Sequence, residues 1–141
     1  MGVVQPTYAD AYHVIICGSG GEEEYIAKFQ HWGERLEQAL INNVGSSSSN
    51  VFLLTEGSES DTPPNDTALV TSTVDSIRSA FEIVAEQSQV EDNVFVYIIG
   101  HGSFYKSISR VHVPGVDLTV ADMAAFIEPV TAQNLVIING S

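Results

Sequence analysis

The stretch NVFVYIIGHGS, residues 93–103, joins an apolar run of β-branched and aromatic residues to a histidine that stands between two glycines. Consecutive apolar positions are typical of a strand that helices cover on both faces. We therefore expect Asn93–Ile99 to be the central strand of a parallel sheet. Gly100, His101 and Gly102 follow directly and should lie in the loop at its carboxyl end.

The remainder of the chain indicates further strands and helices in alternation. β-branched runs between turn residues predict the strands, and apolar residues three or four positions apart predict the helices. The expected strands are 13–17, Val51–Thr55 and 135–138, the expected helices are 22–42, 67–87 and Val120–Ile127, and an edge strand at 111–113 should form a hairpin with the residues after Phe104. Asp66 or Thr67 is the expected cap of the second helix. This order predicts an α/β three-layer sandwich, a mainly parallel sheet flanked by helices, with the last of the four buried strands at 135–138.

Length and composition narrow the classes of function. The 141 residues suit a single domain spanning 1–141, and the formal net charge of −13 disfavours nucleic acid and anionic membrane surfaces as partners. No run reaches the ~20 apolar residues of a membrane span. Cys17 is the only cysteine, so neither an internal disulfide nor a cysteine-based zinc site can form, and we expect neither metal nor cofactor. No secretory signal is visible, and the cellular compartment stays open.

Three glycine-containing stretches follow predicted parallel strands: Cys17 to Gly21, Gly100 to Ser103, and Asn139 to Ser141. The loops after the carboxyl ends of parallel strands form the functional crevice of an open sheet, so these stretches should meet there. The first stretch has glycines before a helix, as phosphate-binding loops do. Glu22, Glu23 and Glu24 would repel a phosphate, however, and they suit the positive end of the helix dipole.

His101 is the strongest candidate for a catalytic residue. Its place at the end of a strand, between glycines that allow close approach of another chain, favours a general base, and an exposed turn histidine is the equally supported alternative. The backbone amides around Gly100 and Gly102 suit an oxyanion hole. His13, His31 and His112 lack this context and are expected to be structural.

The run NVFVYIIGHGS resembles the histidine-bearing strand and loop of the caspase, legumain and gingipain group of cysteine peptidases. HVIICGSGGEEEYIAKFQHWGERLEQAL is similar to the first strand and helix of bacterial legumain-like proteins of this fold. HVPGVDLTVADMAAFIEPVTAQNLVIINGS resembles their stretch between histidine and nucleophile. The resemblance spans residues 13–141 and implies a caspase-like fold, a peptide or protein substrate, and His101 as the base.

The same resemblance implies that the nucleophile follows the fourth strand, at about position 142, and that two more strands come after it. The sequence ends at Ser141, so we expect a domain that is incomplete at its C-terminus and inactive on its own. Cys17 is the alternative nucleophile within the chain, because the end of the first strand should lie near the crevice. Ser141 and Ser103 are poorly placed for this role.

Two other functions stay open, and one assembly is expected. A pseudopeptidase would use the same crevice to bind a peptide or a protein without cutting it, and a flavodoxin-like or nucleotide-binding domain is the third alternative. The apolar run at 135–138 would form an exposed sheet edge, through which we expect a homo-oligomer.

Overall fold

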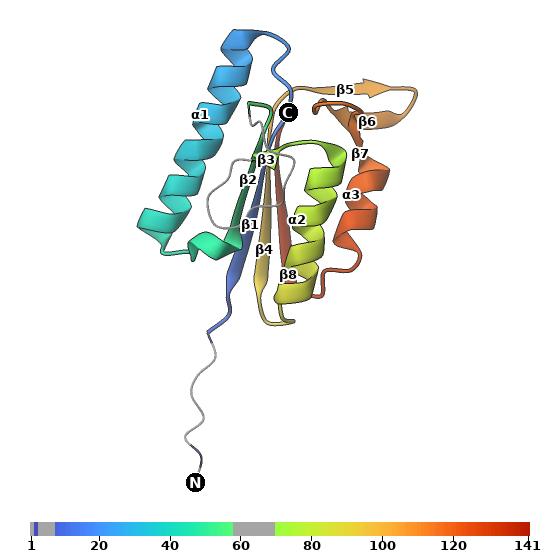
Figure 1. The fold of residues 1–141 in the computed structure, drawn as a ribbon. Helices are drawn as coiled ribbons and strands as arrows, with labels where there is room; N and C mark the ends of the chain where they lie inside the picture. The colour runs from blue at the N-terminus through green and yellow to red at the C-terminus, as the bar shows by residue number, and fades with distance from the viewer. Residues whose placement is uncertain (1, 3–7, 58–69) are drawn as a thin grey trace.

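The computed structural model describes residues 2, 8–57 and 70–141, and it has an α/β fold. Five strands form a parallel sheet in the order β3-β2-β1-β4-β8 (Figure 1). The strands are β1 (Ala11–Cys17), β2 (Val51–Thr55), β3 (Val70–Thr71), β4 (Asn93–Ile99) and β8 (Asn134–Gly140). The helices are α1 (Glu23–Ala39), α2 (Val74–Gln87) and α3 (Val120–Ile127). The predicted mainly parallel sheet between helices is confirmed.

A second, antiparallel sheet lies at the carboxyl end of the first (Figure 1). It contains β5 (Gly102–Tyr105), β6 (Ile108–Val111) and β7 (Leu118–Thr119), in that order. Lys106 and Ser107 form the two-residue turn between β5 and β6, and both have positive φ angles, 49° and 64°. Such angles suit the twist of a tight hairpin. The hairpin therefore begins immediately after His101.

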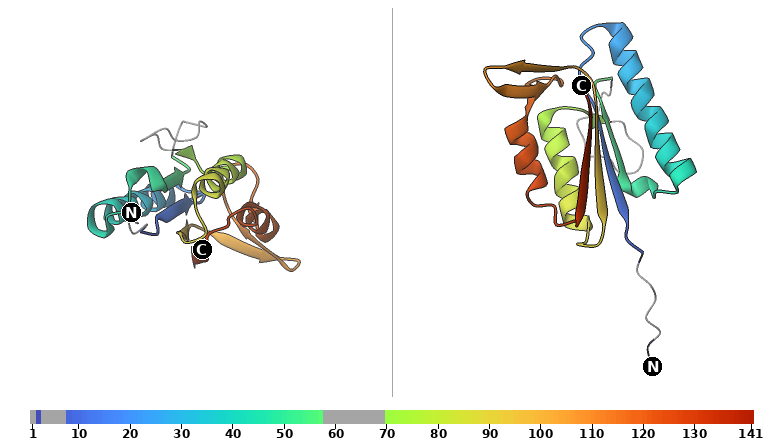
Figure 2. Two further views of the ribbon diagram at one scale, coloured as in Figure 1. Left: turned by 90° about the horizontal axis from the view of Figure 1, so that it is seen from below. Right: turned by 180° about the vertical axis from the view of Figure 1, so that it is seen from behind.

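The helices form two layers around the main sheet (Figure 2). On one face, Ile77 and Phe81 of α2 and Phe126 of α3 pack against Val14 and Val96. On the other face, Phe29 of α1 packs against a smaller cluster that includes Ile15, Cys17 and Leu53. The alternation of side chains along β1 feeds both clusters, as expected for a strand covered on both sides.

The central strand is β1, and the prediction that Asn93–Ile99 is central was wrong. β1 lies between β2 and β4, and its residues from Tyr12 to Cys17 are all buried. On β4 only alternate residues are buried, while Phe95, Tyr97 and Ile99 are half-buried. An apolar run shows that a strand is covered, but the order of strands depends on pairing that the run does not encode.

The second helix begins later than predicted. Val70 and Thr71 pair with Leu54 and Thr55 as strand β3, and α2 starts at Val74 with the Thr73 hydroxyl accepting from the amide of Ser76. Asp66 and Thr67, the expected caps, lie outside the described residues. The first helix also ends earlier, at Ala39, and continues as a π-helical turn, Leu40–Val44, that closes at Gly45.

Two other predictions need correction at the C-terminal side of the chain. β8 covers Asn134–Gly140 and most of it is exposed, so the expectation of a buried strand at 135–138 was wrong. Its α1-side face has no helix over it among the described residues, because α1 packs on β1 and β2. The edge strand expected at 111–113 is β6 at Ile108–Val111, with its hairpin partner β5. Val51–Thr55, Asn93–Ile99 and Val120–Ile127 have the predicted bounds.

Candidate functional site

The three glycine-containing stretches meet at the carboxyl end of the main sheet, as predicted. The amide of Gly18 donates to the carbonyl of Ile99 at 2.8 Å, which ties the loop after β1 to the end of β4. A methyl group built on Gly100 would lie 3.2 Å from Cα of Gly18, and one built on Gly102 would lie 3.0 Å from Oγ of Ser141. The parallel arrangement of β1, β4 and β8 brings these loops to one edge.

His101 lies at this edge with an exposed side chain. Its ring contacts Tyr25 and Phe29 of α1 edge-on, with centroids 5.0 Å away in both cases. Tyr25 and Phe29 are four residues apart and therefore share one side of the helix. Within the part of the chain that the structure describes, the imidazole makes no side-chain hydrogen bond, so both ring nitrogens are free to meet a substrate or a nucleophile.

Gly102 presents its backbone polar groups away from the hairpin. The amide of His112 donates to the carbonyl of His101 at 2.9 Å, and these two residues continue the β5–β6 register beyond Gly102 and Val111. In an antiparallel ladder, hydrogen-bonded and non-hydrogen-bonded pairs alternate. The pair Gly102 and Val111 is therefore of the second kind, and the Gly102 amide points outward, next to His101.

The end of β8 lies next to Gly102 and forms a further part of the site. The hydroxyl of Ser141 donates to Oδ1 of Asn139 at 2.8 Å, and the Ser141 amide donates to the same oxygen at 3.1 Å. Both residues are exposed. The side chain that follows β8 therefore lies beside Gly102, although its hydroxyl is bonded to Asn139.

Cys17 does not have the properties of a nucleophile. Its side chain is buried in the α1-side core, and its thiol donates to the carbonyl of Phe29 at 3.3 Å. Burial raises the pKa of the Cys17 thiol to about 12, and the nearby Glu34 carboxylate adds to the effect. Attack requires the thiolate, which this environment disfavours. The structure therefore argues against Cys17 as a catalytic residue.

The other histidines occupy different surroundings. His13 is buried, with its two ring nitrogens 3.2 Å from Tyr97 Oη and 3.0 Å from Ser46 Oγ. His112 Nδ1 lies 3.0 Å from Oδ1 of Asp117, and His31 is exposed on α1. Since none of these contacts involves His101, the three have separate, local roles.

Two amides of the first glycine-rich loop are bonded to other parts of the protein. The Gly20 amide donates to Oε2 of Glu56 at 2.8 Å, and the Ser19 amide donates to the carbonyl of His112 at 2.7 Å. A carboxylate of the protein thus occupies the place that an anion would need. The role of Glu56 had no signal in the sequence, because it depends on where the loop after β2 meets the loop after β1.

A cleft of about 320 Å³ adjoins Gly102, between the hairpin and the end of β8. Its apolar residues are Phe104, Val111, Leu118 and Val120, and its polar residues are Ser103, Ser109, Arg110, Asn139 and Ser141. Sequence analysis did not identify this cleft, because it depends on how the hairpin folds over the sheet.

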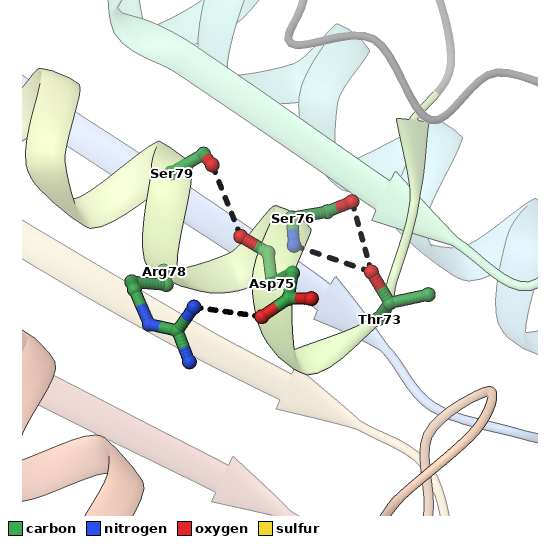
Figure 3. Close-up of polar contacts among 5 residues, drawn as sticks. All are labelled: Thr73, Asp75, Ser76, Arg78 and Ser79. Atoms are coloured by element: carbon green, nitrogen blue, oxygen red, sulfur yellow. Dashed lines mark hydrogen bonds and ion pairs between the residues drawn. The ribbon is translucent and has the colours of Figure 1, made fainter.

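A larger cavity, of about 610 Å³, lies at the start of α2. Figure 3 shows its polar groups bonded to one another: Arg78 donates to Oδ1 of Asp75 at 2.7 Å, Ser79 to the Asp75 carbonyl, and Thr73 to Ser76 Oγ. These contacts stabilise the first turns of the helix. None of these residues is a predicted site residue.

Comparisons with protein families and with curated proteins find no match to this chain. No helix among residues 8–57 and 70–141 is long and apolar enough to cross a membrane. The same residues contain no group of three or more histidine, cysteine or carboxylate side chains that could hold a metal ion.

Proposed function

We propose that this chain is the histidine-bearing part of a caspase- or legumain-like cysteine peptidase, with the nucleophile at position 142, the second residue after β8. The proposal rests mainly on the approach of Ser141 to Gly102, where a methyl group would lie 3.0 Å from the Ser141 hydroxyl. A side chain one residue further on would start from the same loop. It would therefore emerge near the loop that carries His101, whose side chain is exposed.

The roles follow from the chemistry of thiol peptidases. His101 takes the proton of the cysteine thiol, and the thiolate attacks the carbonyl carbon of the scissile peptide bond. The outward amide of Gly102 is suited to stabilise the oxyanion that forms. The protonated His101 then gives its proton to the leaving amine, and water hydrolyses the thioester.

Tyr25 and Phe29 are positioning residues in this proposal. Their edge-on contacts limit the rotation of the His101 ring without occupying either nitrogen. An oriented base lowers the entropic cost of reaching the transition state. The two rings could be recognised in the sequence only as part of the helical stripe of α1.

The test is peptide cleavage by a protein that includes the residues encoded after Ser141. We expect a cysteine at position 142, cleavage of a mixed fluorogenic peptide library, and a loss of about 10²- to 10⁴-fold in rate for His101→Ala. His31→Ala, which removes an exposed histidine of α1, is the matched control and should retain full activity. Unchanged cleavage by His101→Ala would overturn the role of the histidine.

A pseudopeptidase is the second candidate, and one observation favours it. The side chain that lies beside Gly102 is the Ser141 hydroxyl, which is bonded to Asn139, while the one cysteine of the chain is buried. A protein with serine or glycine at position 142 that binds peptides without cleaving them would support this candidate. Covalent labelling of position 142 by a peptidyl electrophile would exclude it.

A further inference from the structure

We infer that an extended peptide binds along the free edge of β5 as an additional strand and places an apolar side chain in the cleft beside Gly102. The inference rests on the proposed function in one respect, since it names where the substrate or ligand peptide of that site would lie. Three observations carry it: the edge, the direction of its polar groups, and the cleft.

β5 is an edge strand that starts one residue after His101. Within residues 8–57 and 70–141 it pairs only with β6, and all four of its residues are exposed. An edge strand presents unpaired N–H and C=O groups to which another extended chain can bind. A peptide held there would run past the imidazole.

The backbone groups on this edge are set by the hairpin ladder. Because the His101 and His112 pair is hydrogen-bonded, the pairs Ser103 with Arg110 and Tyr105 with Ile108 are hydrogen-bonded as well. The N–H and C=O groups of Gly102 and Phe104 must then point away from β6. An added strand forms its hydrogen bonds with alternate residues of the strand that it joins, and Gly102 and Phe104 are two residues apart.

The cleft supplies a place for a side chain of the peptide. Gly102, Val111 and Leu118 lie opposite one another across the small sheet and share one face, and Phe104 lies on that face two residues from Gly102. Phe104 is 74% exposed, although it lines a cleft of about 320 Å³. Since Phe104, Val111 and Leu118 share this face, they form an apolar wall against which an apolar side chain of the peptide can pack.

The test is a titration of the ¹⁵N-labelled 141-residue chain with the neutral peptide acetyl-Thr-Val-Leu-Val-Thr-amide, followed by NMR. We expect amide shifts at Gly102–Tyr105 and at Val111 and Leu118. The matched control peptide carries proline at its centre, which removes a backbone donor, and should bind at least about tenfold more weakly. Shifts confined to β8, or none, would overturn the inference.

Two variants separate the backbone contacts from the side-chain contact. Phe104→Pro removes an outward N–H but none of the β5–β6 hydrogen bonds, so the hairpin should persist while peptide binding is lost. Phe104→Ala keeps that N–H and should lower affinity only for peptides with an apolar central residue. Unchanged binding by Phe104→Pro, with the hairpin intact by NMR, would contradict the proposed mode.

The outcome is independent of whether the protein cleaves peptides. Binding at β5 by a protein that does not cleave would support the inference and reject the peptidase proposal. Cleavage that depends on His101, without shifts at β5, would support the peptidase and reject this binding mode. His31→Ala, at an exposed position of α1, should leave the affinity for the peptide unchanged, because the edge contacts are made by Gly102 and Phe104.

Discussion

α2 and α3 lie side by side over one face of the main sheet, whereas α1 covers only part of the other (Figures 1 and 2). On the first face Val94 and Val96 of β4 are completely buried. On the second, Phe95 and Tyr97 of the same strand are half-buried, and Val136 and Ile138 of β8 are 42% and 49% exposed. β4 is therefore fully covered on one side and only partly covered on the other.

The connections between the strands explain this difference. The step from β1 to β2 runs toward one edge of the sheet and carries α1, while the steps from β3 to β4 and from β4 to β8 run toward the other edge and carry α2 and α3. Right-handed crossovers that move in opposite directions place their helices on opposite faces. The uncovered part of the α1-side face therefore follows from the order in which the strands are connected, and not from the residues on that face.

The largest expected effect compares two isoleucines. Ile16 is completely buried on the α2 side of β1, so Ile16→Ala should lower the free energy of unfolding by about 2–5 kcal/mol. Ile138→Ala, on the open surface, should cost less than about 1 kcal/mol. Urea denaturation of the two variants measures both. Equal losses would show that Ile138 is packed against something in solution.

Association through β8 is the next effect in size. The strand has no charged residue, although the chain has a net charge of −13. Ile137 is 45% exposed, and antiparallel pairing of two copies centred on this residue would place Val136 of one copy opposite Ile138 of the other. We predict a dimer of the 141-residue chain in analytical ultracentrifugation, strengthened by salt, which screens the repulsion between copies. Further strands from a longer polypeptide would compete for the same edge.

Ile137→Lys should abolish this dimer, because a lysine on an edge strand opposes pairing. Val90→Lys, which adds the same charge at an exposed position outside the strands, is the matched control and should still dimerise. A monomer at high protein concentration and high salt would contradict the prediction.

A smaller effect concerns pH. Burial lowers the pKa of His13, so its imidazole stays neutral in the folded protein at pH values where it is protonated in the unfolded chain. The unfolded state then binds more protons, and stability is lost as pH falls below about 6.5 through the folded pKa. His13→Leu should remove this part of the pH dependence of the urea midpoint. His31→Leu, at an exposed site, should leave it unchanged.

The smallest expected effect is the reaction of Cys17 with iodoacetamide. With a pKa of about 12, the thiol of the folded protein should remain unmodified at pH 8 while the unfolded chain is alkylated. Mass spectrometry with and without urea measures this difference. Rapid labelling of the native protein would show that the α1 side opens readily.

Local patterns were sufficient to predict many elements of the fold. The bounds of Val51–Thr55, Asn93–Ile99 and Val120–Ile127 agree with the structure, because side-chain periodicity and flanking turns define them. Val70 fits a helical spacing equally well, and only its pairing with Leu54 makes it a strand. The central position of β1 likewise depends on pairing between segments that are distant in the sequence.

The site was predictable to a similar degree. The meeting of the three glycine-containing loops follows from a parallel sheet, and His101 lies where the end of β4 places it. The contacts of Tyr25 and Phe29 with His101, and the bond from Gly20 to Glu56, depend on how α1 and the loop after β2 approach the sheet. Sequence periodicity does not carry that information.

The central position of β1 has a consequence for how the chain folds during synthesis. β1 is made first, yet its neighbour β4 is made last but one among the strands of the main sheet, and 82 residues separate Asp10 from its hydrogen-bond partner Asp92. Until Asn93–Ile99 leaves the ribosome, the backbone groups of β1 that pair with β4 have no partner, and its apolar side chains are not yet buried. Such long-range pairing slows folding and exposes the nascent chain to aggregation. We therefore expect the growing polypeptide to be most prone to aggregation before Asn93–Ile99 pairs with β1.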